Sequence, residues 1–246
     1  MARQAQILEL IQTRGFQSVR DLANELKVDE STVRRHLYKL ESLALINRTH
    51  GGASPVESAE TPSRIKQTIH SPEKKKIGQA MAEKLLDGQV ILLDSGSTTL
   101  EVAKALKNRV LTVVTNDLAI GIELQRKPNI NIVFIGGEIL ANLNTTWGPT
   151  AVEQIKRLRV DVGVFGVDSV SANGVFNNTS NEIESKQAMM AISGQAYFVA
   201  DSSKFTRKAL FKVFNIDQFT AGITDDSLDE DVANQIPLPI IRVGSN

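Results

Sequence analysis

A polar loop between an apolar run and a helical pattern is the first segment with the residue types for ligand chemistry. In LLDSGSTTLEVAKAL (residues 92–106) the apolar run ends at Asp94, and the loop continues with Ser95, Gly96, Ser97, Thr98 and Thr99. Backbone amides and hydroxyls at a helix start bind anions, because unpaired N–H groups and the helix dipole point at the ligand. We expect the segment from Gly96 to Thr99 to hold a phosphate.

Other polar residues also follow apolar runs. Asp94, Thr115, Gly136 and Asp168 each lie at or just after the end of a predicted strand, and ligands of open α/β sheets bind outside the carboxyl ends of the strands. We expect acceptors for sugar hydroxyls at Asn116, Asp117 and Asp168, positive charge from Lys186 and Lys204, and an ordering role for Glu182 or Glu184. Simpler interpretations stay open: a tight turn at Gly136-Gly137, caps at Asp94 and Asp168, a surface Lys204, and a helix-surface ion pair between Glu182 and Lys186.

The elements that carry these residues alternate. Apolar, β-branched runs occur at 90–93, 110–115, 130–135, 160–167, 197–200 and 240–243, with helical patterns between most of them. This alternation predicts an α/β fold, an open and mostly parallel sheet of the Rossmann-like kind with helices on both faces. We expect this domain over residues 72–246, after a proline-containing linker at 57–71.

Residues 1–56 predict a second, smaller domain. Apolar residues at helical spacing indicate three short helices, the second capped by Ser18 and the third by Ser31, followed by two short strands or extended arms. This order is that of a winged helix-turn-helix. With Val33, Leu37 and Leu40 facing the core, the third helix and the arm leave a polar surface for DNA: Ser31, Thr32, Arg34, Arg35, His36, Tyr38, Lys39, Arg48, Thr49 and His50.

Composition limits the chemistry. The chain has 246 residues, zero formal net charge, no cysteine and three histidines, all within the first 70 residues. Disulfides and thiolate metal sites are therefore excluded, and we expect neither metal nor cofactor. No apolar run approaches the ~18 residues of a membrane-spanning helix, and no signal peptide is recognisable, so we expect a cytoplasmic protein with no membrane partner.

The segment SVRDLANELKVDESTVRRHLYKLESLALINRTHGGA resembles the N-terminal domain of the DeoR family of bacterial transcriptional regulators. Thr32 to Leu37 and Arg48 to Ala53 match its pattern, except that His36 stands where the family usually has Asp. DSGSTT, TND, GG, GVDS, NEIESK and DSSKF follow in the order of the family's sensor domain, which is related to ribose-5-phosphate isomerases. The resemblance covers nearly the whole chain and implies a sugar-phosphate effector.

Three functions are compatible with these features. The first, which we favour, is a repressor of a sugar-utilisation operon, acting as a homodimer or homotetramer on double-stranded operator DNA under the control of a phosphorylated sugar. The second is a sugar-phosphate isomerase-like enzyme with an appended DNA-binding arm, and the third a non-specific architectural DNA binder. Isomerisation needs a positioned general base. After Asp168 the chain continues Ser169-Val170-Ser171 without a further acid, so we expect no catalytic residues.

Overall fold

The structure is a computed structural model that describes residues 2–56, 61–107, 109–140 and 142–244. The chain divides into two compact units, residues 1–69 and residues 70–246. The first unit thus extends beyond residue 56, the expected end of the N-terminal domain. Within the expected linker, α4 (Ser63–Lys66) is helical, and Ile65 and Ile69 pack into the core of the first unit.

The first unit is a winged helix-turn-helix, as predicted. Its elements are α1 (Ala2–Arg14), β1 (Gln17–Ser18), α2 (Val19–Leu26), α3 (Glu30–Glu41), β2 (Ile46–Thr49) and β3 (Gly52–Pro55). Ser18 caps α2 as expected, accepting a hydrogen bond from the Asp21 amide at 3.0 Å. The prediction for α3 was wrong by two residues: Asp29, not Ser31, is the cap, because its carboxylate accepts from the Thr32 amide at 2.8 Å.

The wing is the antiparallel pair β2–β3, extended by the two-residue strand β1 in the order β1-β3-β2. Gly52 lets β1 and β3 approach, since a Cβ there would lie 2.3 Å from the Gln17 carbonyl oxygen. Buried aliphatic side chains from α1, α2 and α3 form the core beneath the wing. This core fixes which face of α3 turns outward.

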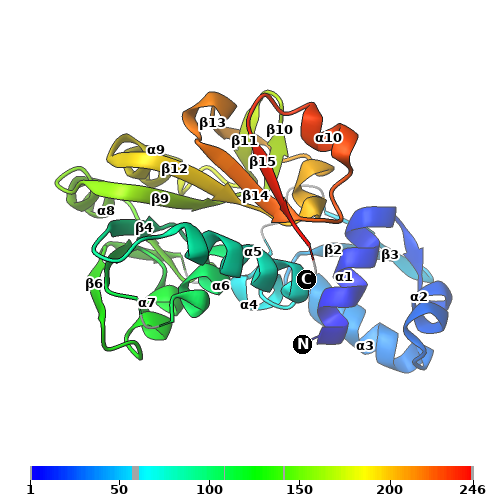
Figure 1. The fold of residues 1–246 in the computed structure, drawn as a ribbon. Coiled ribbons are helices and arrows are strands. Elements are labelled where there is room, and N and C mark those ends of the chain that lie inside the picture. Colours follow the sequence, from blue (N-terminus) through cyan, green and yellow to red (C-terminus); the bar gives the residue numbers. More distant parts are fainter. Residues whose placement is uncertain (1, 57–60, 108, 141, 245–246) are drawn as a thin grey trace. The chain divides into compact units, whose positions relative to one another are not determined.

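The second unit contains a seven-stranded sheet in which every neighbouring pair is parallel, in the order β15-β14-β12-β9-β4-β5-β6. Its strands are β4 (Val90–Leu93), β5 (Leu111–Thr115), β6 (Ile130–Phe134), β9 (Val160–Gly166), β12 (Ser193–Val199), β14 (Ala221–Asp225) and β15 (Ile240–Val243). The predicted open α/β sheet is therefore confirmed. Figure 1 shows it as a twisted layer with helices on both sides.

Helices cover the two faces of the sheet with separate apolar cores. One core joins the sheet to α5 (Ser71–Lys84), α6 (Ser97–Ala105) and α7 (Leu118–Leu124). The other joins it to α8 (Pro149–Ile155) and α9 (Ile183–Ala191). Four aromatic rings, Phe165, Phe198, Phe214 and Phe219, meet edge to face in this second core.

Smaller elements complete the second unit. They are the hairpin β7 (Glu138–Leu140) and β8 (Thr145–Trp147), the three-stranded sheet of β10 (Ser169–Ser171), β11 (Gly174–Asn177) and β13 (Phe211–Phe214), the short helices η1 (Ser202–Phe205) and η2 (Ile216–Gln218), and α10 (Glu230–Asn234). Among the residues that the structure describes, no helix is long and apolar enough to cross a membrane.

Candidate functional site

The predicted DNA-contacting surface lies on α3 and the wing. Val33, Leu37 and Leu40 are buried, and this leaves Ser31, Arg34, Arg35, Tyr38 and Lys39 exposed on α3 and Arg48, Thr49 and His50 exposed on the wing. Thr32 and His36 are partly buried between the two faces. The geometry suits a helix whose polar side enters the major groove.

Two arginines of this surface already have acidic partners. Arg34 pairs with Glu30 at 2.6 Å, and Arg48 pairs with Glu41 at 3.1 Å. Exposed pairs of this kind contribute about 0–1 kcal/mol, so phosphate or a base can replace the acid at low cost. Within the described part of the chain, Arg35 and Lys39 take part in no ion pair, which leaves their charges available to DNA.

Ser31 and Thr32 are held by the cap of α3. Both hydroxyls donate to the Asp29 carboxylate, Thr32 at 3.0 Å. Hydrogen bonds from Ser31 and from the amide and hydroxyl of Thr32 lower the pKa of Asp29. The two residues therefore shape the start of α3, a local role that the sequence analysis had assigned to Ser31 alone.

His36 is the position where the sequence departs from the family pattern. Partial burial lowers its pKa, and the neighbouring positive charges of Arg35 and Lys39 lower it further. The imidazole is therefore neutral near pH 7. A neutral ring in place of a carboxylate adds no negative charge to this part of α3.

The predicted phosphate loop lies at the start of α6, after strand β4. Gly96 precedes the helix at φ 142°, and no side chain of the described residues caps the first turn. The backbone amides of Ser97, Thr98 and Thr99 belong to the first turn of α6. Within the described residues, the side-chain hydroxyls of Ser97 and Thr98 make no hydrogen bond. The Thr99 hydroxyl differs, because it donates to the Gly96 carbonyl at 2.9 Å. Free amides and two free hydroxyls therefore converge at one helix start.

Beneath this loop lies a buried ion pair. The Lys186 ammonium of α9 donates to the Asp94 carboxylate and, at 3.1 Å, to the Gly166 carbonyl, and both side chains are almost fully buried. Burial raises the pKa of Asp94 to about 6, although Lys186 opposes the shift. Burial acts against the charge of Lys186, but Asp94 and Glu182 outweigh it and raise the Lys186 pKa. The pair joins the ends of β4 and β9 to α9.

Glu182 does not pair with Lys186 across one helical turn. Its carboxylate accepts from the buried Ser95 hydroxyl at 2.6 Å. The loop that contains Ser95 is also held by Asp117, which follows β5: its carboxylate accepts a hydrogen bond from the Gly96 amide at 3.3 Å. Asp117 also caps α7 through the Ala119 and Ile120 amides, and burial raises its pKa to about 6. These contacts fix the loop from both sides.

The other expected effector residues differ in what they contact. Thr115 accepts from the Asp117 amide at 3.2 Å, and the Asn116 side-chain amide donates to the Thr146 carbonyl at 2.9 Å. Gly136 donates to Gln154 on α8 at 3.1 Å, and a Cβ on Gly137 would lie 2.4 Å from the Trp147 carbonyl oxygen. The glycine pair thus forms a close-packed turn against α8 and β8.

A second polar cluster lies at the ends of β12 and β14, and sequence analysis identified only Lys204 there. Asp201 is buried, with His70 Nε2 4.0 Å from its Oδ1. Burial acts against the Asp201 charge, but Lys204, Lys74 and His70 outweigh it and lower the Asp201 pKa. Asp225 accepts from the Ser202 amide at 2.7 Å. The post-strand rule that selected Asp94 would also have selected Asp201.

His70 belongs to the second compact unit. The expected start of the sensor domain at residue 72 leaves all three histidines outside this domain. The second compact unit begins at His70, so it does contain one histidine. Elsewhere at the sheet edge, Asp168 accepts from the Asn178 amide at 3.1 Å, and within the described residues no cluster of three or more His, Asp or Glu could hold a metal ion.

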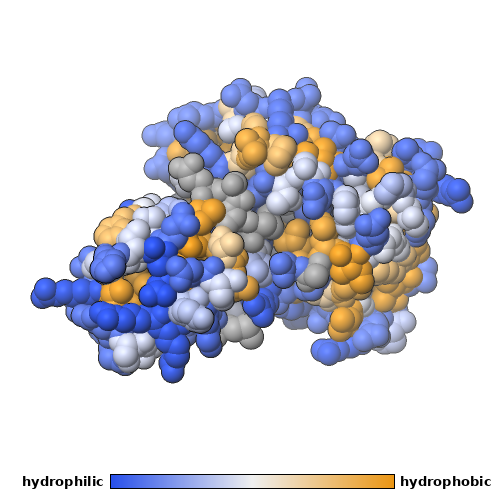
Figure 2. Space-filling model, turned by 180° about the vertical axis from the view of Figure 1, so that it is seen from behind, coloured by the Kyte–Doolittle hydropathy of each residue, from blue (hydrophilic) through white to orange (hydrophobic). Residues whose placement is uncertain are grey.

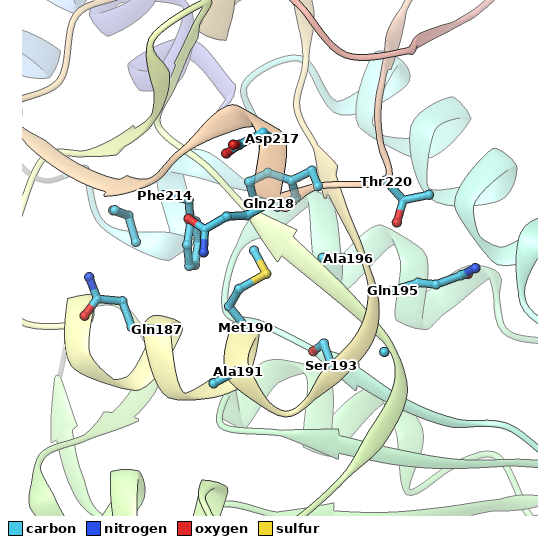
Figure 3. Close-up of a pocket in the computed structure, with 13 residues that line it drawn as sticks. Gln187, Met190, Ala191, Ser193, Gln195, Ala196, Phe214, Asp217, Gln218 and Thr220 are labelled. Atoms are coloured by element: carbon cyan, nitrogen blue, oxygen red, sulfur yellow. The ribbon is translucent and has the colours of Figure 1, made fainter.

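A hollow of about 660 Å³ lies at the other end of β12, its amino end, and Figure 3 shows the residues that line it. Met190 of α9 and Phe214 of β13 point toward it from opposite sides. Glutamines line the rim, and among the described residues that line the hollow Asp217 is the one with a charge. Since none of these described residues is a cation, they do not suit a phosphate.

Taken together, a winged helix with an exposed basic face and an open α/β unit with a polar strand edge define a DNA-binding regulator with a sensor domain. Comparison with known families agrees: residues 3–59 match the DeoR-like helix-turn-helix domain, and residues 69–226 match the DeoR C terminal sensor domain. The chain belongs to the DeoR family. It is a DNA-binding transcriptional repressor of this type, like its curated relatives.

Curated relatives align over most of their length. The glycerol-3-phosphate regulon repressor of Escherichia coli is 32% identical over 222 residues, 89% of this chain and 88% of the relative. The HTH-type transcriptional repressor CsqR of Escherichia coli is 33% identical over 91% of this chain and 87% of its own. The transcriptional repressor AccR of Agrobacterium fabrum is 32% identical over 91% and 88%. Ribose 5-phosphate isomerase A from Methanocaldococcus jannaschii is structurally similar over 55% of each chain, with a TM-score of 0.41 and 16% identity.

Proposed function

We propose that this repressor controls a sugar-utilisation operon and that a phosphorylated sugar or polyol, bound at the start of α6, changes its affinity for operator DNA. The observation that carries the proposal is the first turn of α6, where three amides and the Ser97 and Thr98 hydroxyls have no partner among the described residues. Donors of this kind fit a phosphate dianion. The glycerol-3-phosphate regulon repressor of Escherichia coli, by its name, controls a response to a phosphorylated polyol.

The sugar part of the ligand would contact residues at the same strand edge. Asp168 and Asn116 are its candidate partners, and Lys204 would contribute positive charge from η1. Asp94, Lys186 and Glu182 have a different role, because their charged groups already bind one another or the loop. They would position the loop and not contact the ligand directly.

The effector acts through an equilibrium between forms of the protein. It shifts operator affinity only by the difference in its own affinity for those forms. A single winged helix makes few base contacts, so the repressor would bind as a homodimer or homotetramer to paired half-sites about one helical turn apart. It would work where the operator is, in the cytoplasm.

A thermal-shift screen with phosphorylated sugars and glycerol 3-phosphate tests the site. A true effector at about 100 times its dissociation constant should add about 2.7 kcal/mol to the stability of the sensor unit. Thr98→Ala should weaken this response, and Thr220→Ala, a matched change at the hollow in Figure 3, should not. The site assignment fails if Thr220→Ala is the variant that loses the response, or if neither variant does.

A further inference from the structure

The two edges of the seven-stranded sheet differ in how they are protected. β15, at one edge, carries Arg242, whose guanidinium lies 3.7 Å from Glu230 and donates to the Asp226 carbonyl at 3.1 Å. β6, at the other edge, reads INIVF and has no charged residue or proline. Natural edge strands are normally blunted by such residues, because an open edge pairs with other chains. β6 pairs with β5 on one side, and no described strand pairs with its other side.

Exposed apolar side chains surround this open edge. Phe134 ends β6, Ile122 lies on α7 and Ile139 on β7, and they are 38%, 54% and 58% exposed. The Phe134 ring packs over Gly121, where an added Cβ would lie 3.3 Å from it. β7 is held beside the end of β6, because Thr146, opposite Ile139 in the hairpin, donates to the Ile135 carbonyl at 2.6 Å. Figure 2 shows apolar side chains gathered at the end of the sheet that carries β6.

We propose that the β6 edge, with the apolar residues Ile122, Phe134 and Ile139, is a twofold interface with a second copy of this chain. An edge strand can pair antiparallel with itself, and such an isologous contact closes after two copies. About an axis at Ile132, Asn131 faces Val133 of the partner subunit, so no like charges meet along the strands. Apolar side chains then cover one another on both sides of the axis.

The charges that flank β6 suit the same pairing. Arg126 and Lys127 precede the strand and Glu138 follows it. In the antiparallel arrangement the end of β6 that follows Arg126 meets the end of the partner strand that precedes Glu138, and the symmetry repeats this meeting of opposite charges at the other end. Both residues are exposed, and within the described chain neither takes part in an ion pair. Opposite charges placed this way favour self-association over pairing with a chain of another charge pattern.

The interface is tested by the mass of the full chain in solution, without DNA or sugar phosphate. Light scattering coupled to gel filtration should give a dimer or a multiple of it for the 26.9 kDa chain. Asn131→Lys puts like charges close to the axis and should raise the dissociation constant about tenfold or more. Leu210→Glu is the matched control, since Leu210 is 70% exposed outside the β6 region, and it should leave the mass unchanged.

A charge exchange separates a real interface from a folding defect. Arg126→Glu and Glu138→Arg should each weaken the dimer, and the double variant should restore it. The melting temperature of each variant as a monomer, followed by circular dichroism, should not change. A monomeric wild type, or an Asn131→Lys variant with wild-type mass, would overturn the proposal. Dimerisation supports operator binding in the proposed function, but this measurement uses no operator or effector, so either proposal can fail alone.

Discussion

The DNA-contacting surface on α3 and the wing and the loop at the start of α6 use charge in opposite ways. On α3 and the wing the arginines are exposed, and the two with acidic partners, Arg34 and Arg48, form exposed pairs that exchange easily. Beneath the loop that precedes α6, Asp94 and Lys186 are buried against each other, and removing either one leaves the other charge buried without its partner. The charges of the first surface are therefore available to DNA, whereas the buried pair holds the loop before α6 in one shape. Mutations should separate these roles into effects on DNA binding and on stability.

The largest expected effect is on the buried pair. Lys186→Ala should lower the free energy of unfolding of the sensor unit by about 3–5 kcal/mol, because Asp94 is left buried without its partner. Lys104→Ala is the control, since Lys104 pairs with Glu101 in the same unit at 2.7 Å but is partly exposed. Its expected loss is about 0.2–0.5 kcal/mol. Chemical denaturation measures the free energy of unfolding of both variants. Similar losses for the two would contradict the difference between the buried and the exposed ion pair.

The buried carboxyl of Asp117 should make stability depend on pH. Its pKa in the folded unit is about 6, above the ~3.9 of an unfolded chain. The folded state then binds more protons, so the stability from this carboxyl is present below about pH 4 and is lost as the pH rises through 6. Asp117→Asn keeps an acceptor at the cap of α7 and removes the titration. The wild type should lose about 2–3 kcal/mol relative to this variant between pH 4 and pH 7, and parallel stability curves would refute the burial argument.

On α3 the expected effect is on DNA and not on folding. Arg35→Ala should weaken operator binding by about 1–3 kcal/mol, the usual contribution of one arginine contact to a base. Arg14→Ala, on α1 and paired with Glu25 at 2.8 Å, should leave operator affinity unchanged. Fluorescence anisotropy gives the affinity and thermal melting the stability. A drop in melting temperature as large as that of Lys186→Ala would contradict the division between the two regions.

The smallest effect belongs to the exposed acids of the DNA surface. Glu30→Gln removes the partner of Arg34 and should cost the helix-turn-helix unit about 0.3–0.5 kcal/mol. Operator binding should become tighter, because a negative charge near the phosphates is lost and Arg34 is released. Melting and anisotropy at two salt concentrations check both expectations. Weaker binding by this variant would mean that Glu30 orients Arg34 for a base.

Local patterns predicted the elements well where one interaction dominates. The strands β4, β5, β6 and β9 follow from apolar, β-branched runs, and the cap of α2 follows from Ser18. β14 was missed because its sequence, AGITD, is short and contains Gly222. That glycine is explained only by the fold, since a Cβ there would lie 2.1 Å from the Phe198 ring.

The contacts within the candidate site also depend on the fold and could not be predicted from local sequence. Residues at strand ends could be selected from the sequence, because strand ends of a parallel sheet share one edge. Their partners could not. Asp94 and Lys186 are 92 residues apart, and sequence spacing suggested Glu182 as the Lys186 partner instead. Burial decided the outcome: Lys186 satisfies the carboxylate next to it in the core, and Glu182 accepts from Ser95.

The central claim is that a phosphorylated ligand at the start of α6 controls DNA binding by α3. The direct test is an anisotropy titration of the full chain on an operator selected from random duplexes, with and without each thermal-shift hit. The account predicts that one phosphorylated sugar or polyol changes operator affinity at least about fivefold, the lower range of allosteric coupling, and that Thr98→Ala abolishes this change while keeping affinity for the operator alone. Equal affinities with and without every hit would contradict it.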